Sequence, residues 1–94
     1  MKINFPNGDI YDMRFYYRED RKRKTINTIC TVSERIEKGN YRLVESGDAK
    51  QNPKDHFNKD LGRRISLGRA IKRFIDPHKK VIWEEYRKYC PIKK

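Results

Sequence analysis

The chain has 94 residues, which suits one domain with one modest core. Lys and Arg number 24 against 13 Asp and Glu, so the formal net charge is +11. Repulsion within so basic a chain favours a partner that carries negative charge, such as nucleic acid, a nucleotide, an acidic protein or an anionic membrane surface. The four Phe, six Tyr and one Trp fall into periodic runs, which argues against a disordered chain.

Cysteine usage and hydropathy narrow the class of protein further. Cys30 and Cys90 have neither a metal-site nor a redox spacing, and only His56 and His78 could join them as ligands. A zinc site needs about four ligands, so we expect reduced thiols, no metal and no cofactor. The first residues lack the apolar stretch of a signal peptide, and no apolar run approaches the roughly 20 residues that span a bilayer. We therefore expect a cytoplasmic protein with no membrane partner.

The first half of the chain has the period-two pattern of β-strands. Four strands are predicted, at residues 2–5, 10–18, 25–33 and 41–46. The turns between them are predicted at residues 6–9, 18–24 and 37–40, two of which contain Gly next to Asn. On the second strand, Tyr11, Met13, Phe15 and Tyr17 face one way, and Asp12, Arg14, Tyr16 and Arg18 face the other. An antiparallel meander with one face exposed to water is the simplest assembly.

The second half has helical periodicity. Asn52-Pro53 has the sequence of a helix cap followed by proline, and predicts a long helix from about Pro53 to Ile75. Asp76-Pro77 repeats this signal and predicts a second, shorter helix over about Pro77–Tyr89. One side of the long helix, which we expect to lie on the sheet, carries Phe57, Leu61, Ile65, Gly68, Ile71 and Ile75. The prediction is a single α+β domain over residues 1–94, in the order ββββαα.

The opposite side of the long helix is the first candidate for a binding site. A column of small residues there, which would let another surface approach the helix backbone, consists of Gly62, Ser66 and Ala70. Arginine binds phosphate oxygens through two parallel hydrogen bonds. We therefore predict an anion-binding groove formed by Lys59, Arg63, Ser66, Arg69 and Arg73. Two alternatives stay open: a solvated helix face, or a column that packs against the second helix or another subunit of a homo-oligomer.

Two further basic segments compete for the same role. The predicted hairpin loop carries a secondary basic patch, Arg21, Lys22, Arg23 and Lys24, which could follow a nucleic-acid backbone or simply keep the loop soluble. The segment 86–94 interleaves aromatic rings with cations, so bases could stack there. A core stripe with a polar tail is the favoured explanation of that second pattern.

Catalysis finds little support in the sequence. Gly62 and Gly68 lie inside a helical pattern, whereas a Gly-rich phosphate loop follows a strand. Asp55 and Asp60 are not on one helix face, so they make a poor acid–base pair. We expect no enzymatic activity, and the remaining enzymatic alternative is a nuclease built from scattered acidic residues.

Residues 53–72 carry a sequence pattern that resembles one in a group of known proteins. Residues 53–72 contain the pattern Lys54, Asp55, Phe57, Lys59, Gly62, Arg63, Ile65, Leu67, Arg69 and Ala70. It resembles a pattern found after a few β-strands in many small proteins of phages and prophages. Some proteins of that wider group look like counter-defence proteins, including Thoeris anti-defence sponges, which bind cyclic ADP-ribose-type signals, and anti-CRISPR proteins. The helix predicted after Asp76-Pro77 departs from the pattern.

Charge and resemblance together imply a phage counter-defence protein that acts in the cytosol of the host cell. Its target would be an anionic nucleotide signal, such as a cyclic nucleotide held by arginines, or a host defence nuclease such as a CRISPR effector. The alternative is a general nucleic-acid-binding accessory protein of the phage. That alternative is weakened by the lack of a long basic strip with regular aromatic residues in the sequence.

Overall fold

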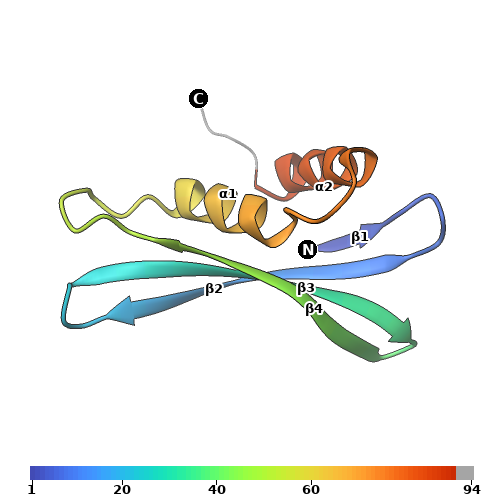
Figure 1. The fold of residues 1–94 in the computed structure, drawn as a ribbon, viewed down its shortest axis with the longest axis horizontal. Helices are drawn as coiled ribbons and strands as arrows, with labels where there is room; N and C mark the ends of the chain where they lie inside the picture. Colours follow the sequence, from blue (N-terminus) through green and yellow to red (C-terminus); the bar gives the residue numbers. More distant parts are fainter. Residues whose placement is uncertain (91–94) are drawn as a thin grey trace.

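The computed structural model describes residues 1–90, which form one antiparallel sheet covered on one side by two helices (Figure 1). The elements in chain order are β1 (Lys2–Asn4), β2 (Ile10–Asp20), β3 (Thr25–Glu37), β4 (Asn40–Lys50), α1 (Lys59–Ala70) and α2 (Asp76–Tyr89). The strands lie in the order β1-β2-β3-β4, and each pairs antiparallel with its neighbour. The predicted α+β fold, with the order ββββαα, is confirmed.

The three long strands extend beyond their predicted bounds because pairing continues into polar and charged segments. Glu19 lies opposite Ile26 near one end of the sheet, and Glu37 lies opposite Asn40 at the other. Backbone hydrogen bonds hold a ladder together whatever the side chains are, so hydrophobic alternation underestimates its length. Gly8 and Gly39 have positive φ angles of 95° and 84°, and so close their turns at little conformational cost.

The core lies between the covered face of the sheet and the two helices. Its buried residues are Ile3, Phe5, Met13, Cys30, Val32, Leu67, Ala70, Ile71, Ile82 and Tyr86. The Tyr86 ring meets the Phe15 ring edge-on, with 6.1 Å between centroids, and its hydroxyl donates to Oδ1 of Asp60 at 3.0 Å. Tyr86 therefore connects α2 both to the sheet and to α1.

Helix α1 lies on the sheet by the face opposite to the one predicted, although Ile71 at its C-terminal end is buried as predicted. The column of small residues points inward, where Ser66 and Ala70 are buried, whereas Leu61 and Ile65 are 46% and 38% exposed. A Cβ atom added to Gly47 of β4 would collide with the backbone of Ser66 and Ala70. The prediction was wrong because it was based on the spacing of large apolar residues alone. Small residues can face the sheet instead, because they let the helix backbone come close to the strand.

Both predicted helix starts are also corrected. Helix α1 begins after Asn58, whose Oδ1 accepts a hydrogen bond from the Leu61 N–H at 3.0 Å. Asn52 instead closes a local turn, in which its Oδ1 accepts from the Lys54 N–H at 3.0 Å. Helix α2 has Ile75 at its N-cap position, so Asp76 lies inside the first turn and is not the cap. Asx turns and helix caps share one sequence signal, because both place a side-chain oxygen near the next backbone N–H groups.

The two cysteines are free thiols in different surroundings. Cys30 is fully buried in the core, and Cys90 is half-buried. Burial raises the pKa of the Cys30 thiol to about 12, because the charged thiolate is disfavoured away from water.

We expect a thiol reagent at pH 8 to modify Cys90 and leave Cys30 unreacted in the native protein, because the thiolate is the reactive form. The pKa of Cys30 lies well above that pH, so its thiol stays protonated. A time course of thiol titration, repeated in denaturant, measures this. Equal rates for both thiols in the native protein would contradict the burial of Cys30.

Because the column of small residues faces the sheet, adding a methyl group under the helix should cost more stability than removing a large apolar side chain from its outer side. Gly47→Ala should lower the free energy of unfolding by about 1–3 kcal/mol, because the added methyl group meets helix backbone and the packing must shift. Leu61→Ala, on the exposed side of α1, should change it by about 0.5 kcal/mol or less. Urea unfolding of both variants measures the difference, and a larger loss from Leu61→Ala would refute this packing.

Candidate anion-binding surfaces

The predicted groove on α1 is filled by the sheet. Ser66 is fully buried, and its hydroxyl donates to the backbone carbonyl of Arg63 at 3.1 Å. A Cβ on Gly62 would collide with the side chain of Thr28 on β3, so no open channel runs along the column. The column is thus a packing site, as one of the alternatives proposed, but for the protein's own sheet. Any anion at this helix would have to be held by the flanking cations alone.

Those flanking cations lie on two different sides of α1. Arg69 donates through Nη1 to the backbone carbonyl of Asp48, at 2.6 Å, and Nη1 of Arg73 lies 3.9 Å from Oε1 of Glu45. Both partners belong to the edge strand β4. Across the helix, Lys59 and Arg63 lie beside Tyr17 of β2 instead. The structure therefore does not gather the predicted residues into one site.

Arg63 is the most enclosed of these cations. Its Nη1 lies 3.4 Å from the Tyr17 hydroxyl, and its Nε is buried without a hydrogen-bond partner among the described residues. Burial opposes the charge, but hydrogen bonding to Tyr17 and Tyr86 outweighs it and raises the pKa of Arg63. Lys59 lies over the same Tyr17 ring, with its Nζ 5.0 Å from the centroid. These contacts join α1 to β2, which gives both cations a packing role.

The secondary basic patch lies in the turn between β2 and β3. Its four side chains are exposed. The carboxylate of Asp20 is used inside the turn, where Oδ1 accepts from the backbone N–H groups of Lys22 at 3.1 Å and Arg23 at 3.2 Å. Lys24 closes the turn with a φ of 55°. The turn therefore holds the Asp20 carboxylate against backbone and leaves the cationic side chains in solvent, next to the exposed side chain of Glu19.

The sheet brings further cations to the same end of the molecule. Arg18 of β2 lies opposite Asn27 of β3, which in turn lies opposite Lys50 of β4, so one row across three strands ends in two cations. Figure 1 shows the β2–β3 turn and the loop from β4 to α1 at the same end of the sheet. We call this cluster the basic end, and it consists of Arg18, Arg21, Lys22, Arg23, Lys24 and Lys50.

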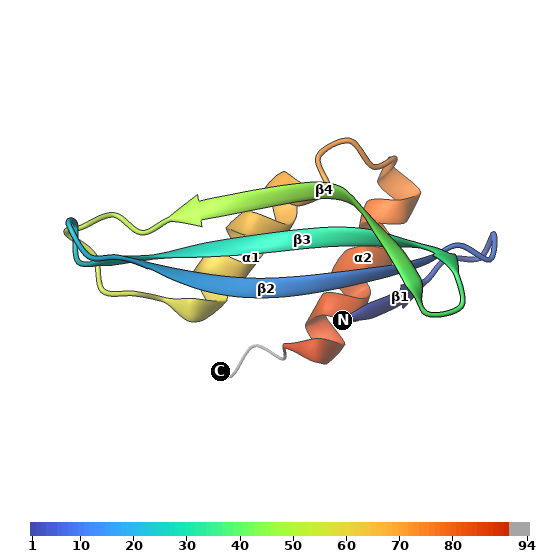
Figure 2. The same cartoon turned by 90° about the horizontal axis from the view of Figure 1, so that it is seen from below.

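The uncovered side of the sheet forms a second surface. Figure 2 shows β2, β3 and β4 in front of both helices, so neither helix covers this side. We call it the open face, and its strand registers bring together Arg14, Tyr16, Arg18, Ile29, Thr31, Arg35, Tyr41, Leu43, Ser46 and Lys50. Tyr16 and Tyr41 are 49% and 41% exposed. The alternation of β2 already placed Tyr16 between two arginines, but only the register adds the residues of β3 and β4.

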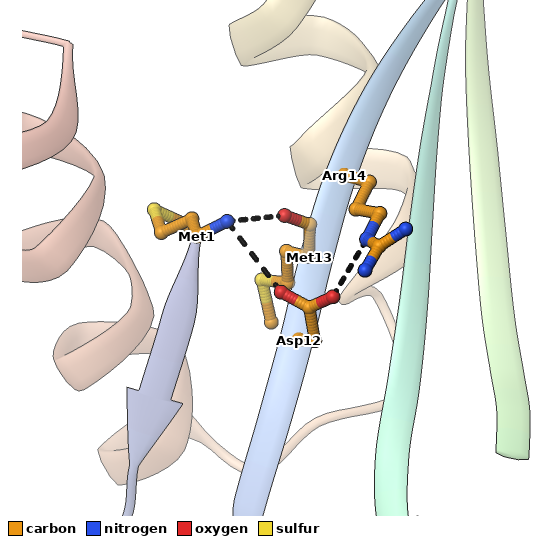
Figure 3. Close-up of polar contacts among 4 residues, drawn as sticks. All are labelled: Met1, Asp12, Met13 and Arg14. Carbon is orange, nitrogen blue, oxygen red and sulfur yellow. Dashed lines mark hydrogen bonds and ion pairs between the residues drawn. The ribbon is translucent and has the colours of Figure 1, made fainter. Parts of the chain in front are cut away.

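Three carboxylates also lie on the open face, Asp12, Asp20 and Asp48, and Asp12 is compensated. In Figure 3 the amino group of Met1 donates to the Met13 carbonyl at 2.7 Å and lies 3.6 Å from Oδ1 of Asp12. Arg14 donates through Nε to Oδ2 of the same carboxylate at 2.8 Å, and this hydrogen bond raises the pKa of Arg14. Asp48 lies opposite Ile29, and Asp20 accepts hydrogen bonds from the backbone of the β2–β3 turn. The open face keeps a positive balance.

A cavity of about 190 Å³ lies between the start of α1 and the ends of β3 and β4. Apolar side chains of Ile26, Phe57, Leu61 and Ile65 contribute to its lining, together with Lys50 and His56. Sites for small ligands usually measure about 300–1,000 Å³ and carry several convergent polar groups. This cavity is smaller and lacks a set of arginines, so it is a poor match for a nucleotide signal.

Comparisons with family models, curated proteins and solved structures give no match to this chain. The resemblance of residues 53–72 to phage proteins therefore stays a prediction. Within residues 1–90, no helix is both long and apolar enough to cross a membrane. Over the same range, no group of His, Cys, Asp and Glu side chains is arranged to hold a metal ion.

Proposed function

We propose that this protein is a non-catalytic binding protein for nucleic acid, and that the basic end provides its main phosphate contacts. The observation that carries the proposal is the convergence of six cations from three segments at one end of the sheet. None of the six forms an ion pair with a carboxylate of residues 1–90. Glu19, Asp20 and Asp48 lie at the same end without pairing to these cations. Phosphate groups would add negative charge there, with release of the counterions that now screen the cations.

An extended polyanion suits this surface better than a single small nucleotide. The side chains of the basic end are exposed and spread over three segments, so they can each reach a different phosphate along a chain. A small signal molecule needs cations that converge on one point, and the arginines of α1 are divided between Tyr17 on one side and Asp48 on the other. The cavity beside α1 is mainly apolar in its lining.

A counter-defence role in the host cytosol is a separate proposal, which rests on the resemblance of residues 53–72. Nucleic-acid binding would serve it by denying a host defence nuclease its substrate or its guide. Direct docking on the nuclease is the second route. A pull-down from host cells, with and without prior digestion of nucleic acid, separates the two: co-purification that survives digestion supports direct docking.

The basic end can be tested by its salt dependence. Replacing Arg21, Lys22 and Arg23 with Gln should weaken binding to a short oligonucleotide and reduce the slope of log K against log salt by about 2–3, since each lost phosphate contact accounts for about 0.7–0.9. Lys24 is left unchanged because its backbone has a positive φ. Fluorescence anisotropy over a series of salt concentrations measures both effects.

The matched control removes three cations from α2, through Lys79→Gln, Lys80→Gln and Arg87→Gln. It changes the net charge equally but lies on the helix side of the sheet (Figure 1). We expect a smaller loss of affinity and an unchanged slope. Equal losses in the two variants would mean that net charge alone drives binding, and absence of binding by the unmodified protein at low salt would refute the proposed function.

A further inference from the structure

We infer that the nucleic acid bound by this protein is single-stranded, and that its unpaired bases stack on Tyr16 and Tyr41 of the open face. This inference rests on the proposed function, to which it adds the class of nucleic acid and the surface that selects it. It starts from two tyrosine side chains that are 49% and 41% exposed on a sheet face that neither helix covers (Figure 2).

Each tyrosine has a cation beside it on the same face. Arg14 and Arg18 lie two residues to either side of Tyr16 along β2, and residues two apart on a strand share a face. Arg14 is paired with Asp12, so Arg18 is the cation beside Tyr16 that can contact a phosphate. Tyr41 of β4 lies directly opposite Arg35 of β3. An aromatic ring flanked by cations can take the face of a base while the cations contact the phosphates next to it. Both tyrosines therefore have the surroundings of a stacking site.

The two stacking positions lie on one continuous path. Tyr16 is opposite Ile29, and Tyr41 is opposite Arg35, so the two rows are separated by six residues of β3. At about 3.3 Å for each residue of a strand, the separation is roughly 20 Å. Two rows lie between them: Arg14, Thr31 and Ser46 form one, and Asp12, Ser33 and Leu43 form the other, with the Asp12 carboxylate paired to Arg14 and the amino group of Met1. A single strand laid along this path would meet tyrosines at both ends, with room for further nucleotides between them.

The path also joins the basic end without a break. Arg18 and Lys50 belong to both surfaces, because their row is the neighbour of the row that contains Tyr16. Asp48 lies in the Tyr16 row on the edge strand, and Asp12 is held by Met1 and Arg14 (Figure 3). A phosphate backbone that leaves the basic end can therefore continue onto the open face, where cations outnumber carboxylates.

Stacking distinguishes a single strand from a duplex. The bases of a duplex are already stacked on one another and present only their edges in the grooves. A single strand offers the faces of its bases to aromatic side chains, and this contact tolerates any sequence. Because neither stacking nor phosphate contact involves the 2′-hydroxyl group, we expect DNA and RNA single strands to bind with similar affinity.

The experiment measures the binding of labelled single-stranded DNA, single-stranded RNA and a DNA duplex of equal length by fluorescence anisotropy. The unmodified protein should bind both single strands more tightly than the duplex. Tyr16→Leu and Tyr41→Leu keep an apolar side chain but remove the aromatic ring, so each should weaken single-strand binding about 5- to 150-fold. Tyr16→Phe and Tyr41→Phe keep the ring and should bind within a few-fold of the unmodified protein.

Tyr89→Leu is the matched control, since Tyr89 is an exposed tyrosine at the end of α2 and lies away from the open face. It should leave binding unchanged, and thermal unfolding checks that all variants are folded. Tighter binding of the duplex, or tyrosine variants that bind like the unmodified protein while the basic-end variant is weakened, would overturn this inference and leave the proposed function standing. If the unmodified protein binds no nucleic acid at all, both fail.

Discussion

The backbone of α1 packs directly against Gly47 of β4. No side chain, however small, fits between them, because a Cβ on Gly47 would meet the backbone of Ser66 and Ala70. This contact sets the rotation of α1 about its own axis. It places the small residues inward, leaves Leu61 and Ile65 partly exposed, and sends the arginines of the helix to its two flanks. The distribution of charge over the covered side of the protein follows from it.

Because of the same contact, the two helices contribute differently to the core. Helix α1 contributes few large buried side chains, Leu67 and the following Ile71 among them, while α2 supplies Ile82 and Tyr86. The hydrogen bond between Tyr86 and Asp60 then ties the helices together. With both helices on one side, no other element of residues 1–90 covers the other side of the sheet, which carries tyrosines and arginines instead. An antiparallel sheet tolerates this, because its side chains alternate between a covered and a solvated face.

Features of the fold were predictable from the sequence where they depend on residues that are neighbours in the chain. The Asn-Gly and Gly-Asn turns and the alternation of β2 are local, so the strands and their order were predicted correctly, apart from strand ends where only backbone pairing continues. The rotation of α1 was not predictable from its apolar residues, since it depends on a glycine in another element. The open face had a partial local signal in Arg14, Tyr16 and Arg18, but Tyr41 joins it only through the register of three strands.

The position of the basic end has a consequence for the rate at which a polyanion would meet this protein. Six cations at one tip of a molecule about 43 Å long make its electric field directional. An approaching phosphate chain would be drawn to that tip first and would turn toward the sheet afterwards, as electrostatic steering predicts. Encounter and seating would then be separate kinetic steps. Ionic strength would act mainly on the first, because screening over about 8–10 Å at physiological salt shortens the reach of the tip without altering an aromatic contact already made.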